Sequence, residues 1–120
     1  MKILIVDDDE SILSSLKNML SFHNHDVESC NNAKDALPMI KNNNYDFLLV
    51  DYNMPGNDGI WFMENAKIPK TTKTLLMTAH VNRNIISKMF SLGASGYIIK
   101  PFDEKELLKN LTFHSNRKNK

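Results

Sequence analysis

Five short apolar runs recur along the chain at similar intervals. They begin roughly 20 to 28 residues apart and are rich in isoleucine, leucine and valine. Each run is short enough for a β-strand, and several are apolar at consecutive positions, as the central strands of parallel sheets tend to be. The pattern predicts five strands at residues 2–6, 26–30, 46–50, 74–78 and 96–99.

The segments after these runs place apolar residues three and four positions apart, which is typical of helices that bury one face. Asp9 precedes the first segment and is placed to cap its amide groups, and Asp103 is a second candidate cap. Gly93 is placed to end the fourth segment. Pro38 would remove a hydrogen bond inside the second, so we expect a kink or a short helix there. The predicted helices lie around residues 12–20, 33–40, 60–66, 85–92 and 102–113.

Strand and helix therefore alternate five times along the chain. This alternation predicts an α/β fold with a doubly wound parallel sheet, helices on both faces and right-handed crossovers. The chain has 120 residues and contains no repeat, low-complexity tract or linker that would divide it. We therefore expect one domain over residues 1–113.

Composition narrows the class of protein. No apolar run approaches the roughly 20 residues that a membrane-spanning helix needs, and the N-terminus lacks the longer apolar segment of a secretory signal. Cys30 is the only cysteine, so an internal disulfide is excluded and a reducing compartment fits. We expect a cytoplasmic protein that does not associate with membranes.

Charge is distributed unevenly. Residues 1–60 carry ten acids and four bases, whereas residues 61–120 carry four acids and eleven bases. Three of those bases lie in residues 114–120, which we expect to be a frayed basic tail, because a nucleic-acid contact would need a larger basic cluster. The basic second half favours, weakly, an acidic protein partner.

Polar side chains that carry chemistry follow or end four of the predicted strands. Asp7 and Asp8 follow the first, Asp51 follows the third, Thr78 ends the fourth and Lys100 follows the fifth. Because parallel strands point the same way, these residues should meet at one edge of the sheet, where open α/β sheets bind ligands. A single aspartate after a strand is usually a helix cap, but this coincidence over four strands indicates a site.

Carboxylates brought this close repel one another unless a positive charge intervenes. A hard divalent cation with oxygen ligands would relieve the repulsion, and Mg²⁺ suits a few carboxylates with several waters. Lys100 adds an ammonium and Thr78 a hydroxyl. A cation, an ammonium and a hydroxyl around one carboxylate would form a receptor for a phosphoryl group, with the carboxylate oxygen as nucleophile.

The segments KILIVDDDE, YDFLLVDYNMPGNDG, LLMTAH and GASGYIIKPF, in this order, resemble the receiver domain of two-component response regulators such as the chemotaxis regulators. The resemblance covers essentially residues 2–113. It implies a flavodoxin-like (βα)5 fold with strand order 2-1-3-4-5. It also implies a signalling phosphoprotein rather than an enzyme, with at most slow Mg²⁺-dependent self-phosphorylation and self-dephosphorylation.

The resemblance implies that Asp51 accepts a phosphoryl group from a sensor histidine kinase or a histidine phosphotransfer protein in a phosphorelay. Asp8 would bind Mg²⁺ directly and Asp7 mostly through a water, while Asp51 and the backbone carbonyl of Asn53 would complete the ligands. Mn²⁺ can substitute for Mg²⁺ in such sites. Gly59 would supply a tight turn nearby.

The resemblance also implies a switch. Thr78 and Lys100 would bind phosphoryl oxygens, and the Lys100–Pro101 peptide bond is expected to be cis, an isomer that proline permits. Movement of Thr78 would let Tyr97 rotate, although simple packing would equally explain an aromatic at that position. His80 and Asn53 would tune the lifetime of the phosphoryl group.

The implied output partner is a protein that binds the surface of residues 85–92, 96–99 and 102–113. Neither nucleic acid nor membrane binding is expected of this domain, and a phosphorylation-dependent homodimer is left open. The chain begins directly before its first strand and ends soon after its last helix, so we expect a module that stands nearly alone. The alternative is the receiver portion of a longer DNA-binding or enzymatic regulator.

Three other classes fit less well. An aspartyl-phosphate phosphatase would need a second acid near Asp51, and Asn53 cannot serve as one. A flavodoxin-like cofactor domain would need a phosphate-binding loop after the first strand, where acids stand instead. A zinc-binding protein would show a known ligand spacing, and none occurs among His23, His25, His80, His114 and Cys30.

Overall fold

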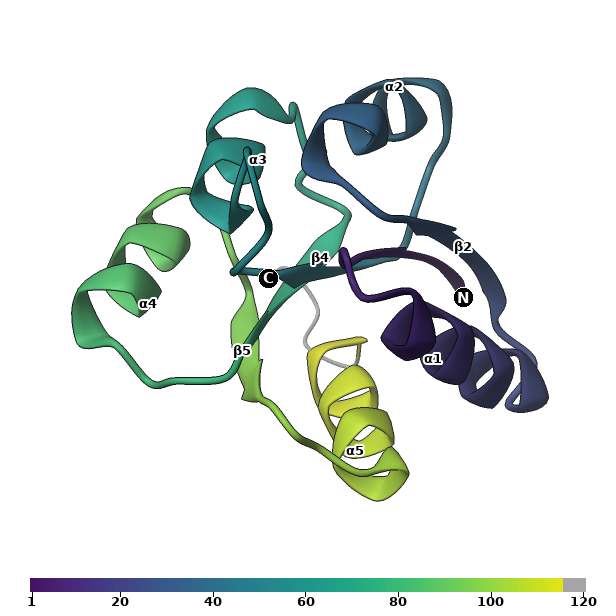
Figure 1. Ribbon diagram of the computed structural model, residues 1–120. Helices are drawn as coiled ribbons and strands as arrows, with labels where there is room; N and C mark the ends of the chain where they lie inside the picture. The colour runs from purple at the N-terminus through teal and green to yellow at the C-terminus, as the bar shows by residue number, and fades with distance from the viewer. Residues whose placement is uncertain (116–120) are drawn as a thin grey trace.

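The computed structural model describes residues 1–115, in which five strands alternate with five helices (Figure 1). The strands are β1 (Lys2–Val6), β2 (Asp26–Cys30), β3 (Phe47–Asp51), β4 (Lys73–Thr78) and β5 (Gly96–Ile99). The helices are α1 (Glu10–Phe22), α2 (Ala33–Asn42), α3 (Gly59–Asn65), α4 (Arg83–Ser91) and α5 (Glu104–Ser115). Within the described residues, no helix combines the length and the apolar character needed to cross a membrane.

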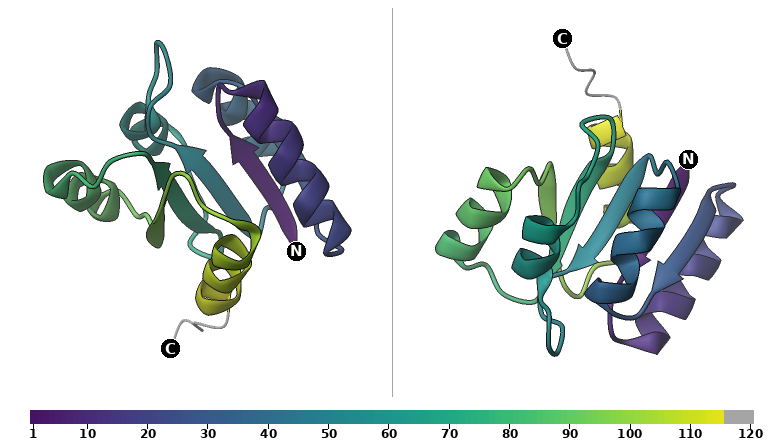
Figure 2. Two further views of the ribbon diagram at one scale, coloured as in Figure 1. Left: turned by 60° about the horizontal axis from the view of Figure 1, so that its bottom comes forward. Right: turned by 90° about the horizontal axis from the view of Figure 1, so that it is seen from above.

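All strand pairs are parallel, and the sheet has the order β2-β1-β3-β4-β5. Helices α1 and α5 cover one face, and α2, α3 and α4 cover the other (Figure 2). The predicted doubly wound fold and its strand order are confirmed. The chain reverses its winding direction at β1, so the carboxyl ends of β1 and β3 lie side by side.

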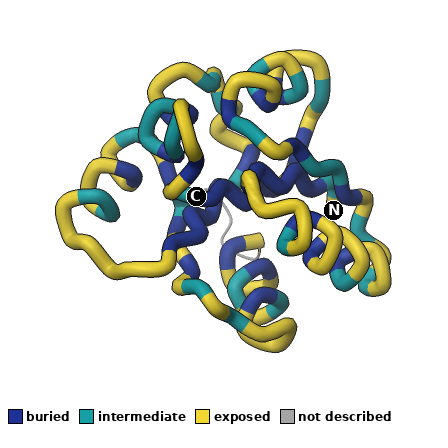
Figure 3. The backbone as a smooth tube through the Cα atoms, in the orientation of Figure 1, coloured by how far each residue is buried: buried dark blue, intermediate teal, exposed yellow. Residues whose placement is uncertain are grey.

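Two apolar cores flank the sheet, and alternate residues of each central strand serve them. On β1, Leu4 and Val6 face α2 and α3, whereas Ile3 and Ile5 face α1 and α5. The buried centre and the exposed outer faces of the helices are apparent in Figure 3. Burial on both faces explains why the strands read as continuous apolar runs rather than as alternating patterns.

The residues that the sequence indicates as helix caps lie at the ends of helices. Asp9 accepts hydrogen bonds from the backbone N–H groups of Ser11 and Ile12 at the start of α1, and Asp103 accepts one from Glu106 in α5. Gly93 has a φ of +109° just beyond α4, a conformation that few other residues adopt. Pro38 lies inside α2 but does not end it, because the helix continues to Asn42.

The prediction of a tail beginning at residue 114 is wrong at its start. Helix α5 continues to Ser115, and His114 is only 8% exposed. The imidazole packs over Gly96, where an added Cβ would lie 2.6 Å from Nε2 of His114. The missing side chain of the glycine therefore makes room for the ring, a long-range fit that helical periodicity does not reveal. Residues 116–120 lie outside the described part of the chain.

This contact predicts a specific coupling between the two positions. Gly96→Ala should destabilise the domain by roughly 1–3 kcal/mol, because the new methyl group overlaps a buried ring. Chemical denaturation of Gly96→Ala, His114→Ala and the double variant would measure the coupling. The double variant should be less destabilised than the sum of the single variants, and simple additivity would contradict the proposed fit.

Candidate functional site

The acidic cluster lies at the carboxyl edge of the sheet, around the ends of β1 and β3. Asp7 directly follows β1, and Asp51 is the last residue of β3. One carboxylate oxygen from each of Asp7, Asp8 and Asp51 lies within 4.8 Å of the others. The structure thus brings together the three carboxylates that the sequence predicted to converge.

Lys100 provides the positive charge of this cluster. Its ammonium nitrogen lies 2.7 Å from Oδ2 of Asp7 and 3.2 Å from Oδ1 of Asp51. The Asp7 side chain is completely buried, and that of Lys100 is 18% exposed. The contact to Asp7 has the length of a strong charge-assisted hydrogen bond, and the longer contact to Asp51 is an ion pair. Lys100 therefore bridges two carboxylates from neighbouring strands.

Asp7 is held firmly in place by the surrounding backbone. Its Oδ1 accepts a hydrogen bond of 2.9 Å from the N–H of Asp9, while Oδ2 accepts from Lys100. The backbone N–H of Asp7 donates to the carbonyl of Cys30 at 3.1 Å. Both carboxylate oxygens are thus engaged, whereas Asp8 is exposed at the mouth of the cluster.

The charges in the cluster do not balance. Burial, and then the neighbouring charge of Asp7, raise the pKa of Asp51 to about 6, although Lys100 and the N–H of Asn53 partly oppose this shift. For Lys100, burial alone would lower the pKa, but the hydrogen bond that its ammonium donates to Asp7 and the charges of Asp51 and Asp7 outweigh burial and raise the pKa overall. One protonated ammonium therefore contacts two of the three carboxylates in the cluster.

This donor set fits a divalent cation. Carboxylate oxygens are the ligands that hard cations prefer, and two buried carboxylates with a third open to solvent leave room for bound water. A cation would also relieve the repulsion that raises the pKa of Asp51. Asn53, whose backbone carbonyl the resemblance adds as a ligand, is exposed in the loop directly beyond β3.

Thr78 ends β4 next to this cluster, but its hydroxyl is occupied within its own turn. Oγ1 of Thr78 donates to the carbonyl of His80 at 2.9 Å and lies 3.3 Å from the backbone N–H of His80. The His80 side chain itself is exposed. The backbone N–H of Lys100 donates to the carbonyl of Thr78 at 2.7 Å, and this bond ties β4 to the start of the next loop.

Tyr97 lies on the same face of the sheet as Thr78. Leu76 pairs with Tyr97 and Thr78 pairs with Ile99, so alternation along the strands directs the side chains of residues 78 and 97 to one face. Tyr97 is 37% exposed and thus not locked in the core. The peptide bond between Lys100 and Pro101 is cis, the isomer that the resemblance implies.

Two glycines shape the loop after β3. Gly56 has a φ of +82°, whereas Gly59, which was expected to supply a tight turn, begins α3. Gly59 matters because a Cβ there would lie 3.0 Å from the Cα of Tyr52 and 3.3 Å from the carbonyl of Asp51. Met54 was overlooked, although it is buried in the core beneath the loop. The sequence feature that could have indicated this burial is an apolar residue within an otherwise polar loop.

The raised pKa of Asp51 predicts a pH-dependent stability. Because the folded state holds this proton more tightly than the unfolded chain, the contribution of Asp51 to stability falls as pH rises from about 4 to about 6. Asp51→Asn should therefore be roughly 1–3 kcal/mol more stable than the parent at pH 8. The difference should vanish near pH 4.

Urea denaturation in chelator at several pH values measures this difference. Glu64→Gln, at an exposed position on α3, is the control and should follow the parent at every pH. An Asp51→Asn variant that is less stable than the parent at pH 8 would show that the cluster is not under repulsion.

Comparisons with known proteins agree with this site and fold. The family described as the response regulator receiver domain matches residues 3–112. The chain is 37% identical to chemotaxis protein CheY-3 of Vibrio cholerae, over 92% of this chain and 88% of that protein. It is 35% identical to chemotaxis protein CheY of Pseudomonas aeruginosa, over 92% and 93% of the two chains.

The chain is also similar to part of a longer regulator and to solved structures. The chain is 36% identical to the two-component response regulator ORR21 of Oryza sativa, but covers only 17% of it. The fold matches a CheY-like receiver domain protein of Methanospirillum hungatei with a TM-score of 0.91 and 31% identity, covering 96% and 93% of the two chains. It matches CheY4 of Vibrio cholerae with a TM-score of 0.87. The chain therefore belongs to the response regulator receiver domain family.

Proposed function

We propose that Asp51 is the residue that accepts the phosphoryl group in this receiver domain. Receiver domains are the phosphoacceptors of two-component systems, and three carboxylates here are candidates. The bridge that Lys100 makes between Asp7 and Asp51 carries the assignment. Asp7 is fully enclosed with both oxygens engaged, and Asp8 has no recorded contact with Lys100 among the described residues. Asp51 contacts the ammonium with a side chain that is 7% exposed, against 0% for Asp7.

The proposed transfer is an in-line displacement at phosphorus. A carboxylate oxygen of Asp51 attacks the phosphorus of a phosphohistidine, forming an acyl phosphate while the phosphorus–nitrogen bond breaks. The bonding pair returns to the imidazole of the donor. Lys100 would turn toward a phosphoryl oxygen while keeping its contact with Asp7, and its charge would stabilise the negative charge of the transferring group.

Asp7, Asp8 and Asp51, with the backbone carbonyl of Asn53, would hold Mg²⁺, and Mn²⁺ can take its place. The ion supplies positive charge next to the phosphoryl oxygens. What the chain itself contributes is a rigid Asp7, a solvent-facing Asp8 and a Lys100 that stays protonated. Asp7 fixes the position of Lys100, and the positive charge of Lys100 would lower the repulsion between Asp51 and an incoming phosphoryl group.

Phosphorylation would act on partners through Thr78 and Tyr97. To reach a phosphoryl oxygen, the Thr78 hydroxyl has to give up its bond to the His80 carbonyl, which would free space on the face where Tyr97 lies. Phe90, Tyr97 and Ile99 are exposed apolar side chains on α4 and β5. We propose that they form, with α5, the surface that a downstream protein or a second copy of the domain binds.

The phosphorylated state would persist rather than be hydrolysed rapidly. Asn53 and the exposed His80 flank the site and would govern access of water to the acyl phosphate. A phosphatase would need a second acid to activate water, and the residue two positions beyond Asp51 is an asparagine. The domain would thus work as a timed switch rather than as a catalyst of repeated turnover.

Intact-mass measurement after incubation with acetyl phosphate tests the assignment. We expect one added phosphoryl group per chain with Mg²⁺ and none with excess chelator. We also expect none in Asp51→Asn, because this variant replaces the nucleophilic carboxylate with an amide. Tyr97→Ala is the control, since it lies outside the chemistry and should become phosphorylated like the parent. Fast hydrolysis is checked with beryllofluoride, which forms a stable complex with an acceptor carboxylate.

Two outcomes would contradict the proposal. Addition of a phosphoryl group to Asp51→Asn would move the acceptor to another residue. If the parent takes up neither phosphoryl nor beryllofluoride in the presence of Mg²⁺, the pocket is inactive and the domain is a constitutive docking module.

A further inference from the structure

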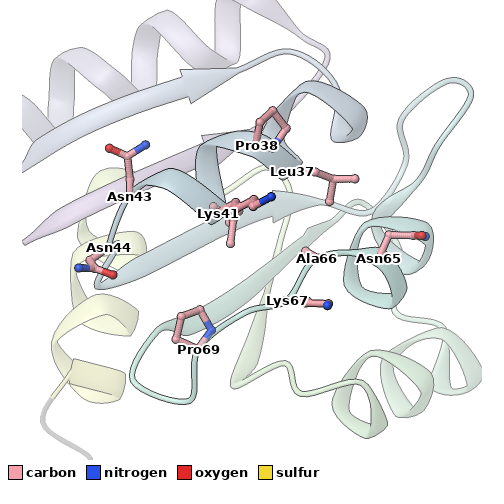
Figure 4. Close-up of a pocket in the computed structure, with 10 residues that line it drawn as sticks. Leu37, Pro38, Lys41, Asn43, Asn44, Asn65, Ala66, Lys67 and Pro69 are labelled. Carbon is pink, nitrogen blue, oxygen red and sulfur yellow. The ribbon is translucent and has the colours of Figure 1, made fainter.

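A groove of about 590 Å³ lies between the C-terminal ends of α2 and α3 (Figure 4). We call it the α2–α3 groove. Leu37, Pro38 and Lys41 belong to its α2 wall, and Ala66, Lys67 and Pro69 to the opposite wall. Each helix starts near the carboxyl edge of the sheet and runs back toward the amino edge. The groove therefore lies at the far end of the domain from the acidic cluster.

The charge of the groove is positive and uncompensated. Lys41 and Lys67 are both exposed and come from opposite walls. Within residues 1–115, neither ammonium has a recorded hydrogen bond or ion pair, and no acidic side chain contributes to the lining. A lysine in the last turn of a helix offsets the helix dipole, which accounts for Lys41. Lys67 lies in the loop beyond the C-cap of α3 and has no such role.

The floor of the groove is apolar. Leu37 and Ala66 are partly buried and pack against the core beneath them, while Pro38 and Pro69 are exposed at its margins. Two prolines give these margins fixed backbone angles. The groove therefore combines apolar side chains with two ammonium groups, and its volume lies within the range of about 300–1,000 Å³ that is usual for binding pockets.

The walls are held in position by asparagine side chains. Nδ2 of Asn43 donates to the carbonyl of Met39 at 3.0 Å, and Nδ2 of Asn65 donates to the carbonyl of Trp61 at 2.8 Å. Oδ1 of Asn43 accepts from the ammonium of Lys2 at 3.2 Å. These bonds satisfy carbonyls that a helix end leaves free, so the groove is preformed rather than created by a partner.

We propose that the α2–α3 groove is a docking site for a short acidic peptide segment of a partner protein. Its carboxylates would pair with Lys41 and Lys67, and an apolar side chain between them would cover Leu37 and Ala66. Charge complementarity favours an acidic segment, and the apolar floor favours a peptide over a free small anion. Because the groove lies at the opposite edge of the sheet, docking does not depend on the state of Asp51.

Selection from a library of displayed eight-residue peptides tests the proposal. The full chain is the target, and peptides that also bind the Lys41→Glu/Lys67→Glu double variant are removed. Enriched peptides should contain acidic residues beside an apolar one. They should bind the double variant at least about tenfold more weakly than the parent, since two ion pairs are replaced by repulsion. Affinity should also fall with added salt.

Two controls make the result specific. Lys17→Glu changes the same charge on the exposed face of α1 and should bind like the parent, as should Asp51→Asn. The amide chemical shifts of the non-proline residues in 37–44 and 65–68 should change. Thermal unfolding of the double variant should match that of the parent, so that lost binding is not lost folding.

Several results would overturn the proposal. These are the recovery of no peptide that discriminates the parent from the double variant, enrichment of peptides without acids, or shift changes confined to other surfaces. Displacement of the peptides by succinate, with no loss of affinity when their apolar residues are replaced by serine, would show a small-anion site instead. None of these outcomes bears on phosphorylation of Asp51.

Discussion

The structure depends on one electrostatic constraint: a single ammonium serves two buried carboxylates that the sheet forces together. Lys100 contacts Asp7 and Asp51, yet Asp8 adds a third negative charge at the mouth of the site. Burial and the charge of Asp7 raise the pKa of Asp51 to about 6, which shows that the compensation is incomplete. A site of this kind is under repulsion, which a bound divalent cation would relieve.

The fold maintains this electrostatically unfavourable arrangement because the packing of the sheet holds the two carboxylates in place. Apolar residues of β1 and β3 are buried on both faces of the sheet, so the two carboxylates cannot separate without disturbing both cores. The hydrogen bonds from Asp9 and to Cys30 fix Asp7 as well. By contrast, Tyr97, on the same face of the sheet as the buried Thr78, is 37% exposed. A rigid site beside a partly exposed aromatic side chain suits a regulatory receiver domain.

Most of the fold could be predicted from the sequence, because buried parallel strands give uninterrupted apolar runs. β1, β2 and β5 have the predicted bounds, whereas β3 begins at Phe47. Asp46 lies directly before it, and its carboxylate accepts a hydrogen bond from the backbone N–H of Lys2. The convergence of the candidate residues was also predictable, since it follows from parallel topology alone.

What the sequence could not provide depends on contacts between distant side chains. The double contact of Lys100, the engagement of Thr78 with His80 and the burial of His114 over Gly96 all require the relative positions of separate elements. The α2–α3 groove is of the same kind, because Lys41 and Lys67 are unremarkable surface residues until two helix ends bring them together. The strand topology predicts which residues lie near one another, but not which hydrogen bonds, ion pairs and packing contacts their side chains make.

Calorimetric titration with Mg²⁺ at pH 6 and pH 8, in buffers of different ionisation enthalpy, tests the central claim most directly. We predict one ion bound per chain, with protons released at pH 6 and far fewer at pH 8, because the ion displaces the proton that burial and the charge of Asp7 favour on Asp51. Asp8→Asn should bind at least about tenfold more weakly, since the solvent-facing ligand is lost. Absence of binding, or binding without proton release at pH 6 and unchanged in Asp8→Asn, would contradict the account.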